Sequence, residues 1–186
     1  MKRIFSFPLI ITAIFLASCN NQQAKVQSAS TENTNAVGQS AVQDSESAKD
    51  VVKVAVGSKD HTTLVSAIKQ AELVDALSNA GPFTVFAPTN EAFDKLPKGT
   101  VDDLMKPENK AKLQDILQYH VYVGIIKPEM MQDGQTLNEV NGGNITIQKS
   151  ADGKITINNS AHIVATIPAS NGIIHVIDGV LLPPSK

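Results

Sequence analysis

The side chains best suited to metal or nucleophilic chemistry in this chain are four histidines and one cysteine. The histidines are His61, His120, His162 and His175, and Cys19 lies near the N-terminus. No two histidines stand four residues apart and no His-Glu-x-x-His motif occurs, so the spacing that puts two ligands on one helical face is missing. We therefore expect no metal site and no cofactor, although histidines distant in sequence could still meet in the fold.

Catalytic motifs of other kinds are also missing. No Gly-x-Ser-x-Gly sequence surrounds a serine nucleophile, and no cysteine follows Cys19. Asp102 and Asp103 are neighbouring carboxylates, but neighbours on a helix point in different directions, which is typical of a solvated face. No glycine-rich phosphate loop occurs, so a dinucleotide-binding fold is not expected. The sequence predicts no catalytic residues and no enzyme.

The composition limits the possible partners and the fold. The 186 residues include 16 basic and 18 acidic side chains, and 42% are hydrophobic, which is enough for a packed core. The pI of about 6.1 argues against a broad basic surface for nucleic acid. A single cysteine excludes a disulfide framework within the chain.

The N-terminus reads as an export signal. Met1–Arg3 is basic, residues 4–16 are almost wholly apolar, and Leu-Ala-Ser-Cys closes the run at 16–19. The tetrapeptide resembles a bacterial lipobox. That resemblance implies a signal peptide over 1–18, cleavage after Ser18 and lipid on Cys19. An ordinary signal peptide with a spare cysteine is the alternative.

The expected anchor defines the expected location. The chain after the signal carries fourteen basic and eighteen acidic side chains, so its negative charge does not attract anionic lipids and the lipid on Cys19 must hold it. Asn20, in place of aspartate, resembles lipoproteins sent to the outer membrane. We expect a lipid-anchored protein of the bacterial cell envelope, on the periplasmic or the surface face.

Composition divides the rest of the chain into a linker and one domain. Residues 19–50 are mostly Asn, Gln, Ser, Thr and Ala, without aromatic residues or a hydrophobic period. Such a segment buries too little surface to offset its ordering entropy. We therefore predict a flexible linker with a root-mean-square end-to-end distance of about 30 Å. Its Ser, Thr and Asn content disfavours a helix. Residues 51–186 form the predicted domain.

The first half of the domain shows helical spacing. Apolar residues three and four apart predict helices around 63–68 and 72–77, with Asp60 as N-cap of the first. Residues 83–87 predict a buried strand. Thr89 is predicted to be an N-cap, and Pro107 to lie in the first turn of a helix. One face of that helix is predicted to carry Leu113, Ile116, Leu117 and His120. An extended run is predicted over 121–123.

The second half alternates between apolar and polar residues. Residues 145–147 and 155–157 flank Asp152-Gly153, a hairpin turn signal. Residues 162–167 and 173–182 predict two more strands joined at Asn171-Gly172. Helices followed by hairpins indicate an α+β fold with mostly antiparallel strands.

Three segments resemble the signature boxes of fasciclin-like domains. They are Gly-Pro-Phe-Thr-Val-Phe-Ala-Pro-Thr-Asn-Glu-Ala-Phe at 81–93, Ile-Leu-Gln-Tyr-His-Val at 116–121, and Asn-Gly-Ile-Ile-His-Val-Ile-Asp-Gly-Val-Leu-Leu-Pro-Pro at 171–184. The resemblance implies a β-wedge or sandwich with several helices packed around it, and a role in adhesion or extracellular interaction without catalysis. Val123 departs from the proline common in the family, and Thr166 from an acidic residue.

The tyrosine–histidine segment supplies the candidate interaction residues. In animal members it has been linked to integrin binding, which by position falls on Tyr119 and His120; we do not extend integrin binding to this chain. Both side chains could instead pack in the core. His120 would lie near a helix C-terminus, where a protonated imidazole is favoured. His175 shares a strand face with Ile173 and Ile177, which favours a hydrogen-bonded core histidine.

Two functions remain open. The first is a monomeric adhesion module that binds a protein or polysaccharide at the envelope or extracellular matrix, through an exposed patch beside Tyr119 or residues 171–184. The second is a carrier of a small apolar ligand, which requires a pocket of several hundred cubic ångströms with a few polar groups.

Overall fold

The structure, a computed structural model, describes residues 48–184. The predicted signal peptide 1–18, Cys19 and nearly all of the predicted linker 19–50 lie outside the described residues, so these remain predictions. Within the described part of the chain, no helix has the length and apolar character needed to cross a membrane.

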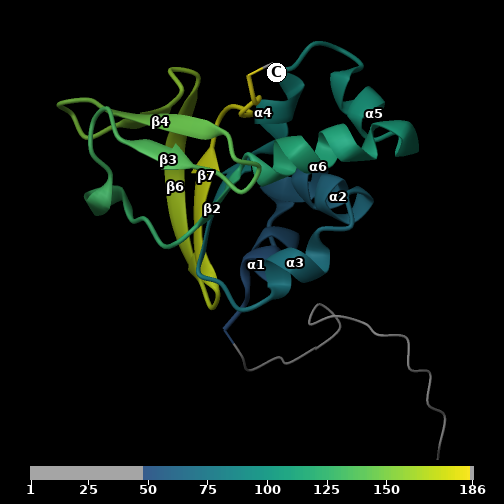
Figure 1. The fold of residues 1–186 in the computed structure, drawn as a ribbon, viewed down its shortest axis with the longest axis horizontal. Coiled ribbons are helices and arrows are strands. Elements are labelled where there is room, and N and C mark those ends of the chain that lie inside the picture. Colours follow the sequence, from purple (N-terminus) through teal and green to yellow (C-terminus); the bar gives the residue numbers. More distant parts are fainter. Residues whose placement is uncertain (1–47, 185–186) are drawn as a thin grey trace, which may run out of the picture. The chain divides into compact units, whose positions relative to one another are not determined.

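Short helices occupy the first half of the described chain. The α-helices are α1 (Val51–Val56), α2 (Thr62–Gln70), α3 (Val74–Ser78), α4 (Asn90–Asp94), α5 (Thr100–Leu104) and α6 (Lys110–Gln118). Three turns of 3-10 helix join them or follow: η2 (Lys59–His61), η3 (Pro107–Asn109) and η4 (Pro128–Met130). Figure 1 shows the α-helices gathered to one side of the strands.

In the described part of the chain, seven strands form one sheet in the order β2-β1-β7-β6-β5-β4-β3. Their bounds are β1 (Phe83–Pro88), β2 (Val121–Val123), β3 (Thr136–Asn138), β4 (Asn144–Lys149), β5 (Ile155–Ile157), β6 (Ala161–Ala169) and β7 (Gly172–Ile177). Only β1 and β7 pair in parallel, and every other neighbouring pair is antiparallel. The predicted α+β fold with mostly antiparallel strands is confirmed.

Two apolar clusters lie on opposite faces of the central pair β1 and β7. Side chains alternate along a strand, so Val85 and Ile174 pack against the helices while Phe86 and Ile177 pack toward the β-hairpins. All six residues of β7 are buried. A strand covered on both faces is typically a nearly continuous apolar run, and residues 173–177 show this pattern apart from His175.

The expected helix starts are partly right. Thr89 caps α4, because its side chain accepts a hydrogen bond from the backbone N–H of Ala92. Pro107 lies in the first turn of η3, directly before α6. Asp60 as an N-cap is wrong: it lies inside η2, whose N-cap is Ser58. The intervening 3-10 turn moves the start of α2 two residues past Asp60.

Asparagines from the two terminal signature boxes fix helix ends over long sequence distances. Asn90 Oδ1 accepts from the backbone N–H of Thr63 at 3.0 Å, and so caps α2. Asn171 Oδ1 accepts from Val51 N–H at 2.9 Å, at the start of α1. The Asn171 amide also donates to Leu77 C=O, at the end of α3, at 2.8 Å. These boxes therefore join the helices to the sheet.

The helix α1 was not expected from the sequence. Its run Val-Val-Lys-Val-Ala-Val is rich in β-branched residues, which favour strands. Asp50 caps it by accepting from Lys53 N–H at 2.8 Å, and Val51 and Val52 are buried in the helical cluster. Tertiary burial with a strong cap overrides the weak local preference.

The predicted hairpins are confirmed, with one strand shorter than expected. Asp152-Gly153 turns between β4 and β5, and Gly153 has a φ of +83°. The strand expected over 173–182 ends at Ile177. Just after that point, the Asp178 backbone N–H still donates to His162 C=O at 3.2 Å, but the His162 backbone N–H donates to the Asp178 carboxylate, at 2.7 Å, and not to a backbone carbonyl.

Candidate functional site

Tyr119 joins the end of α6 to the hairpin strands. Its side chain is 1% exposed. The hydroxyl donates to the C=O of Asn144 at 2.7 Å and accepts from the Asn158 side-chain amide at 3.0 Å. A ring edge lies so close to Gly143 that a Cβ there would stand 2.7 Å from a Tyr119 ring carbon. The phenol is therefore a fully bonded core group.

His120 joins α6 to the segment after β7 and is 3% exposed. Its Nε2 accepts from the Leu181 backbone N–H at 3.0 Å, so Nδ1 carries the proton and donates to Ile116 C=O at 2.8 Å. Burial lowers the pKa of His120 to about 4. The expectation of a protonated imidazole is wrong, because burial outweighs the favourable end of the helix dipole.

The expected partner-binding role of Tyr119 and His120 stays a prediction. Both side chains lie in the interior with their polar atoms bonded inside the domain, and this arrangement gives them a packing role. Cys19, the other predicted site residue, lies outside the described residues.

His175 is a hydrogen-bonded core histidine, as predicted. It has no exposed surface. Nε2 donates to Ile126 C=O at 2.8 Å, which leaves Nδ1 to accept from the Thr166 hydroxyl at 2.9 Å. The ring stacks on Phe86 with 5.6 Å between centroids. Burial lowers the pKa of His175, so this imidazole is neutral and uses both nitrogens.

The strand that follows Tyr119 and His120 lies at one end of the sheet. Backbone N–H groups of Phe86 and Gly124 donate to the C=O groups of His120 and Pro82, each at 2.9 Å. These bonds make Thr84 and Tyr122 a hydrogen-bonded pair, since such pairs alternate in antiparallel ladders. The N–H and C=O of Val123 consequently point away from β1, toward the open edge.

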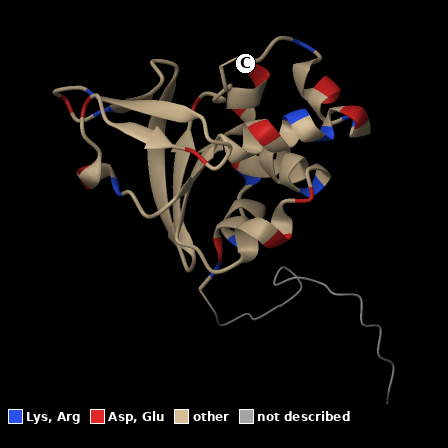
Figure 2. Ribbon diagram, viewed as in Figure 1, with Lys and Arg blue, Asp and Glu red and all other residues tan. Residues whose placement is uncertain are grey.

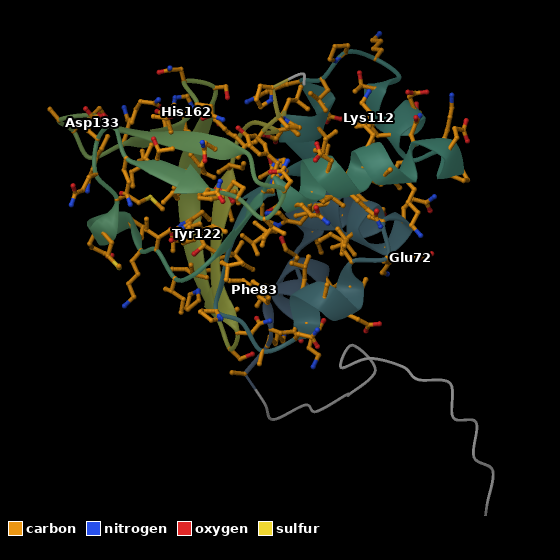
Figure 3. All side chains as sticks on the ribbon, viewed as in Figure 1. Glu72, Phe83, Lys112, Tyr122, Asp133 and His162 are labelled. Atoms are coloured by element: carbon orange, nitrogen blue, oxygen red, sulfur yellow. The ribbon has the colours of Figure 1, made fainter. Side chains whose placement is uncertain are left out.

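Three exposed apolar side chains, Val123, Ile125 and Val140, flank this edge, and we call them the edge patch. They are 62%, 47% and 46% exposed. The Val140 backbone N–H donates to Val121 C=O at 2.9 Å, which holds this residue beside β2. Tyr122, labelled in Figure 3 on the same strand, is half-buried. Val123 and Ile125 of this patch follow directly after the tyrosine–histidine segment in sequence, whereas Val140 follows β3.

A buried acid, Glu139, lies one residue before Val140 and was missed by the sequence analysis. It is 2% exposed, and neither carboxyl oxygen has a hydrogen-bond partner within the described residues. Burial raises the pKa of Glu139 to about 8. The alternation over 136–140 is the signal that could have found it, because Leu137 and Glu139 share the buried face.

A surface cluster of Lys95, His162 and Asp178 holds the end of β7 in place. The Lys95 ammonium donates to Asp178 C=O at 2.6 Å, and the Asp178 carboxylate lies 3.2 Å from His162 Nδ1. Burial acts to raise the pKa of Asp178, but the hydrogen bonds from His162 outweigh it and the net shift is downward. The cluster ties the turn Asp178-Gly179 to β6 and α4, which is a structural role.

Charged side chains are almost absent from the strands of the described chain, although Glu139 lies next to Val140 of the edge patch. Figure 2 shows acidic and basic residues on the helices and on the hairpin loops, while strands β1, β2, β6 and β7 carry none. Asp102 and Asp103 are exposed on α5, as predicted for a solvated face. In residues 48–184, no three His, Cys, Asp or Glu side chains are grouped so that they could hold a metal ion.

Comparison with known proteins identifies the family. The fasciclin domain model matches residues 59–183. Protein sll1483 of Synechocystis sp. is 48% identical over 161 residues, which is 87% of each chain. The cell surface glycolipoprotein MPB83 of Mycobacterium bovis is 39% identical over 130 residues, covering 67% of this chain and 56% of that protein. This chain belongs to the fasciclin family and carries a single fasciclin domain.

A solved structure supports the same fold. The FAS1 domain pair from the insect cell adhesion molecule Fasciclin I aligns with a TM-score of 0.65 at 19% identity. The match covers 72% of this chain and 51% of that structure. The likeness establishes the fold, and the family match with its cell-surface relative supports an adhesion or interaction type of domain.

Proposed function

We propose that this chain is a lipid-anchored protein of the bacterial cell envelope whose fasciclin domain binds a protein partner through the edge patch. The observation that carries the proposal is that the three exposed apolar side chains of the edge patch lie beside the open edge of β2. Val123 contributes both, because its side chain is 62% exposed and its backbone groups point away from β1. Isolated exposed apolar side chains are ordinary, but three beside one edge suit an interface.

The chemistry of the patch favours a protein segment over a polysaccharide. Strand β2 carries no charge, and although Val140 already bonds Val121 C=O, the outward N–H and C=O of Val123 remain at the edge beside apolar neighbours. An extended peptide can add to such an edge, with main-chain bonds for affinity and side-chain contacts for specificity. The buried network of Tyr119 and His120 lies next to this strand, and would hold it rigid while it binds.

The anchor is proposed from the sequence and from one relative. Residues 16–19 resemble a lipobox, and MPB83 is described as a cell surface glycolipoprotein. Lipid on Cys19 would attach the chain to the envelope, with the outer membrane favoured by Asn20. The linker 19–50 would then let the domain stand off the membrane by about 30 Å.

The proposal includes no catalysis. His120 and His175 are neutral, and each uses both ring nitrogens within the domain. General acid–base chemistry needs a titratable group that reaches a substrate proton.

We also expect a monomer, because the edge patch serves a different protein and not a second copy.

The anchor is tested by the variant Cys19→Ala. Without the thiol no lipid is attached, so the variant should be recovered in the soluble fraction after membranes are washed with alkaline carbonate, which strips chains held only by protein contacts. The wild-type chain and a Ser18→Ala control should stay with the membranes. Immunoblots of fractionated cells measure the distribution, and a washed membrane pellet that retains Cys19→Ala would refute the lipid anchor.

The lipid-free chain then allows the binding face to be tested alone. Cys19→Ala protein should sediment with envelopes from cells that lack the chain, and Val123→Asp added to it should reduce sedimentation at least tenfold. Aspartate places a charge in the apolar contact, where desolvation opposes binding. Val164→Asp is the matched control, since Val164 is 59% exposed on β6. Equal loss with both variants would show that the edge patch is not the binding face.

A further inference from the structure

An apolar pocket lies between the helices and the C-terminal segment, away from the edge patch. Its volume is about 430 Å³. The apolar wall is formed by Leu104 of α5, Ile116 of α6 and the segment Leu182–Pro184. Ligand sites of 300–1,000 Å³ with mainly apolar walls and a few polar groups are usual for small molecules. At about 30 Å³ for each water-sized group, the pocket holds roughly fourteen such groups.

The polar lining consists of Thr100, Lys112 and Asp115. Lys112, labelled on α6 in Figure 3, is exposed, and within the described chain its ammonium has neither a hydrogen bond nor an ion pair. The nearby Asp103 already pairs with Lys106 at 2.9 Å. Asp115 Oδ1 lies 3.3 Å from the side-chain amide of Asn141, which bonds this one oxygen of the carboxylate. Lys112 is therefore the basic side chain that this lining offers to an anionic ligand.

We propose that this pocket binds a medium-chain fatty carboxylate, with the alkyl chain against Ile116 and Leu182 and the carboxylate beside the Lys112 ammonium. A chain of about ten carbons with its carboxylate has twelve non-hydrogen atoms, which suits a volume of about 430 Å³. The apolar wall supplies the affinity and Lys112 selects the anionic headgroup. Leu182 is 51% exposed without ligand, so it becomes covered when the alkyl chain binds. The inference does not depend on the proposed function.

The test is isothermal titration calorimetry with decanoate, decanol and decylamine below their micelle concentrations. The protein is the chain from Asn20 to Lys186, which contains both core clusters and has no acyl group on Cys19 to compete. We expect decanoate to bind one to one, more tightly than decanol, and decylamine to bind most weakly. Tighter binding of decylamine would assign the headgroup to Asp115 and overturn the proposal, as would the failure of decanoate to bind.

Two variants separate the alkyl and carboxylate contacts. Leu182→Ser should weaken decanoate and decanol alike, by about fivefold, because it removes apolar contact with the chain. Lys112→Ala should weaken decanoate about three- to fivefold and leave decanol unchanged, which is the size of an exposed ion pair. Lys127→Ala, outside the pocket, is the control. Binding of decanoate that neither Leu182→Ser nor Lys112→Ala changes would place the ligand elsewhere and overturn the proposal.

Discussion

Replacing Glu139 by glutamine is expected to stabilise the folded domain by roughly 4 kcal/mol at pH 8 and by less than about 1 kcal/mol at pH 5. The carboxyl is 2% exposed, and within the described residues its oxygens have no hydrogen-bond partner. Burial raises its pKa from 4.5 to about 8 in the folded state. Glutamine keeps the shape of the side chain and stays neutral at every pH.

The sign of this effect follows from proton binding. Between pH 4.5 and about 8 the folded chain keeps the Glu139 proton while the unfolded chain loses it, because the folded pKa is the higher one. The contribution of this proton to the stability of the wild-type domain is therefore fully present below pH 4.5. It is lost as the pH rises to about 8. The glutamine variant does not suffer this loss.

Urea unfolding of both chains from pH 5 to pH 9 measures the effect. The difference between the two free energies of unfolding isolates Glu139, because the other titrating groups are common to both chains. Glu108→Gln is a matched control at an exposed acid in η3, and should leave the curve unchanged. Parallel curves for Glu139→Gln and the wild type would mean that Glu139 is ionised and solvated in the folded domain.

Truncation of Phe86 to alanine is expected to cost about 3–5 kcal/mol of unfolding free energy. The ring has no exposed surface and stacks on His175 in the cluster between β1 and the hairpins. Alanine removes this apolar area and leaves a cavity that the surrounding strands can fill only in part. Such a loss is a large fraction of the stability of an ordinary domain, 5–15 kcal/mol.

Two further variants keep this expectation testable if Phe86→Ala does not fold. Phe86→Leu keeps most of the apolar volume and should lose less than Phe86→Ala. Phe83→Ala, at a half-buried residue on the same strand, should also lose less. Urea midpoints of the three variants give the comparison. An equal loss for Phe83→Ala and Phe86→Ala would show that the ring of Phe86 is not in the centre of the core.

Much of the fold could be predicted from local pattern. Thr89 and Pro107 act through contacts within a turn, and Asp152-Gly153 marks its hairpin by turn chemistry alone. The features that were missed depend on contacts distant in sequence. Asn90 caps a helix that begins 28 residues earlier, and α1 forms from β-branched residues because the fold buries them. A local reading cannot detect such bonds.

The candidate site was predictable only in part. His175 was assigned to the core because it lies on an apolar strand face, and the structure agrees. The protonated state expected for His120 was wrong, since burial depends on packing against Leu181, 61 residues away. The exposure of Val123 could not be foreseen, because an apolar strand residue looks the same at a sheet edge and in its centre.

Site-specific photocrosslinking in cells tests the central claim, that β2 and the edge patch bind a protein of the envelope. A photoreactive phenylalanine is placed at Val123 or, as control, at Val164 on β6, in otherwise wild-type chains. The account predicts a discrete protein adduct from the Val123 position and none from the Val164 position. Folded, membrane-bound chains that give no adduct at Val123, or the same adducts at both positions, would contradict it.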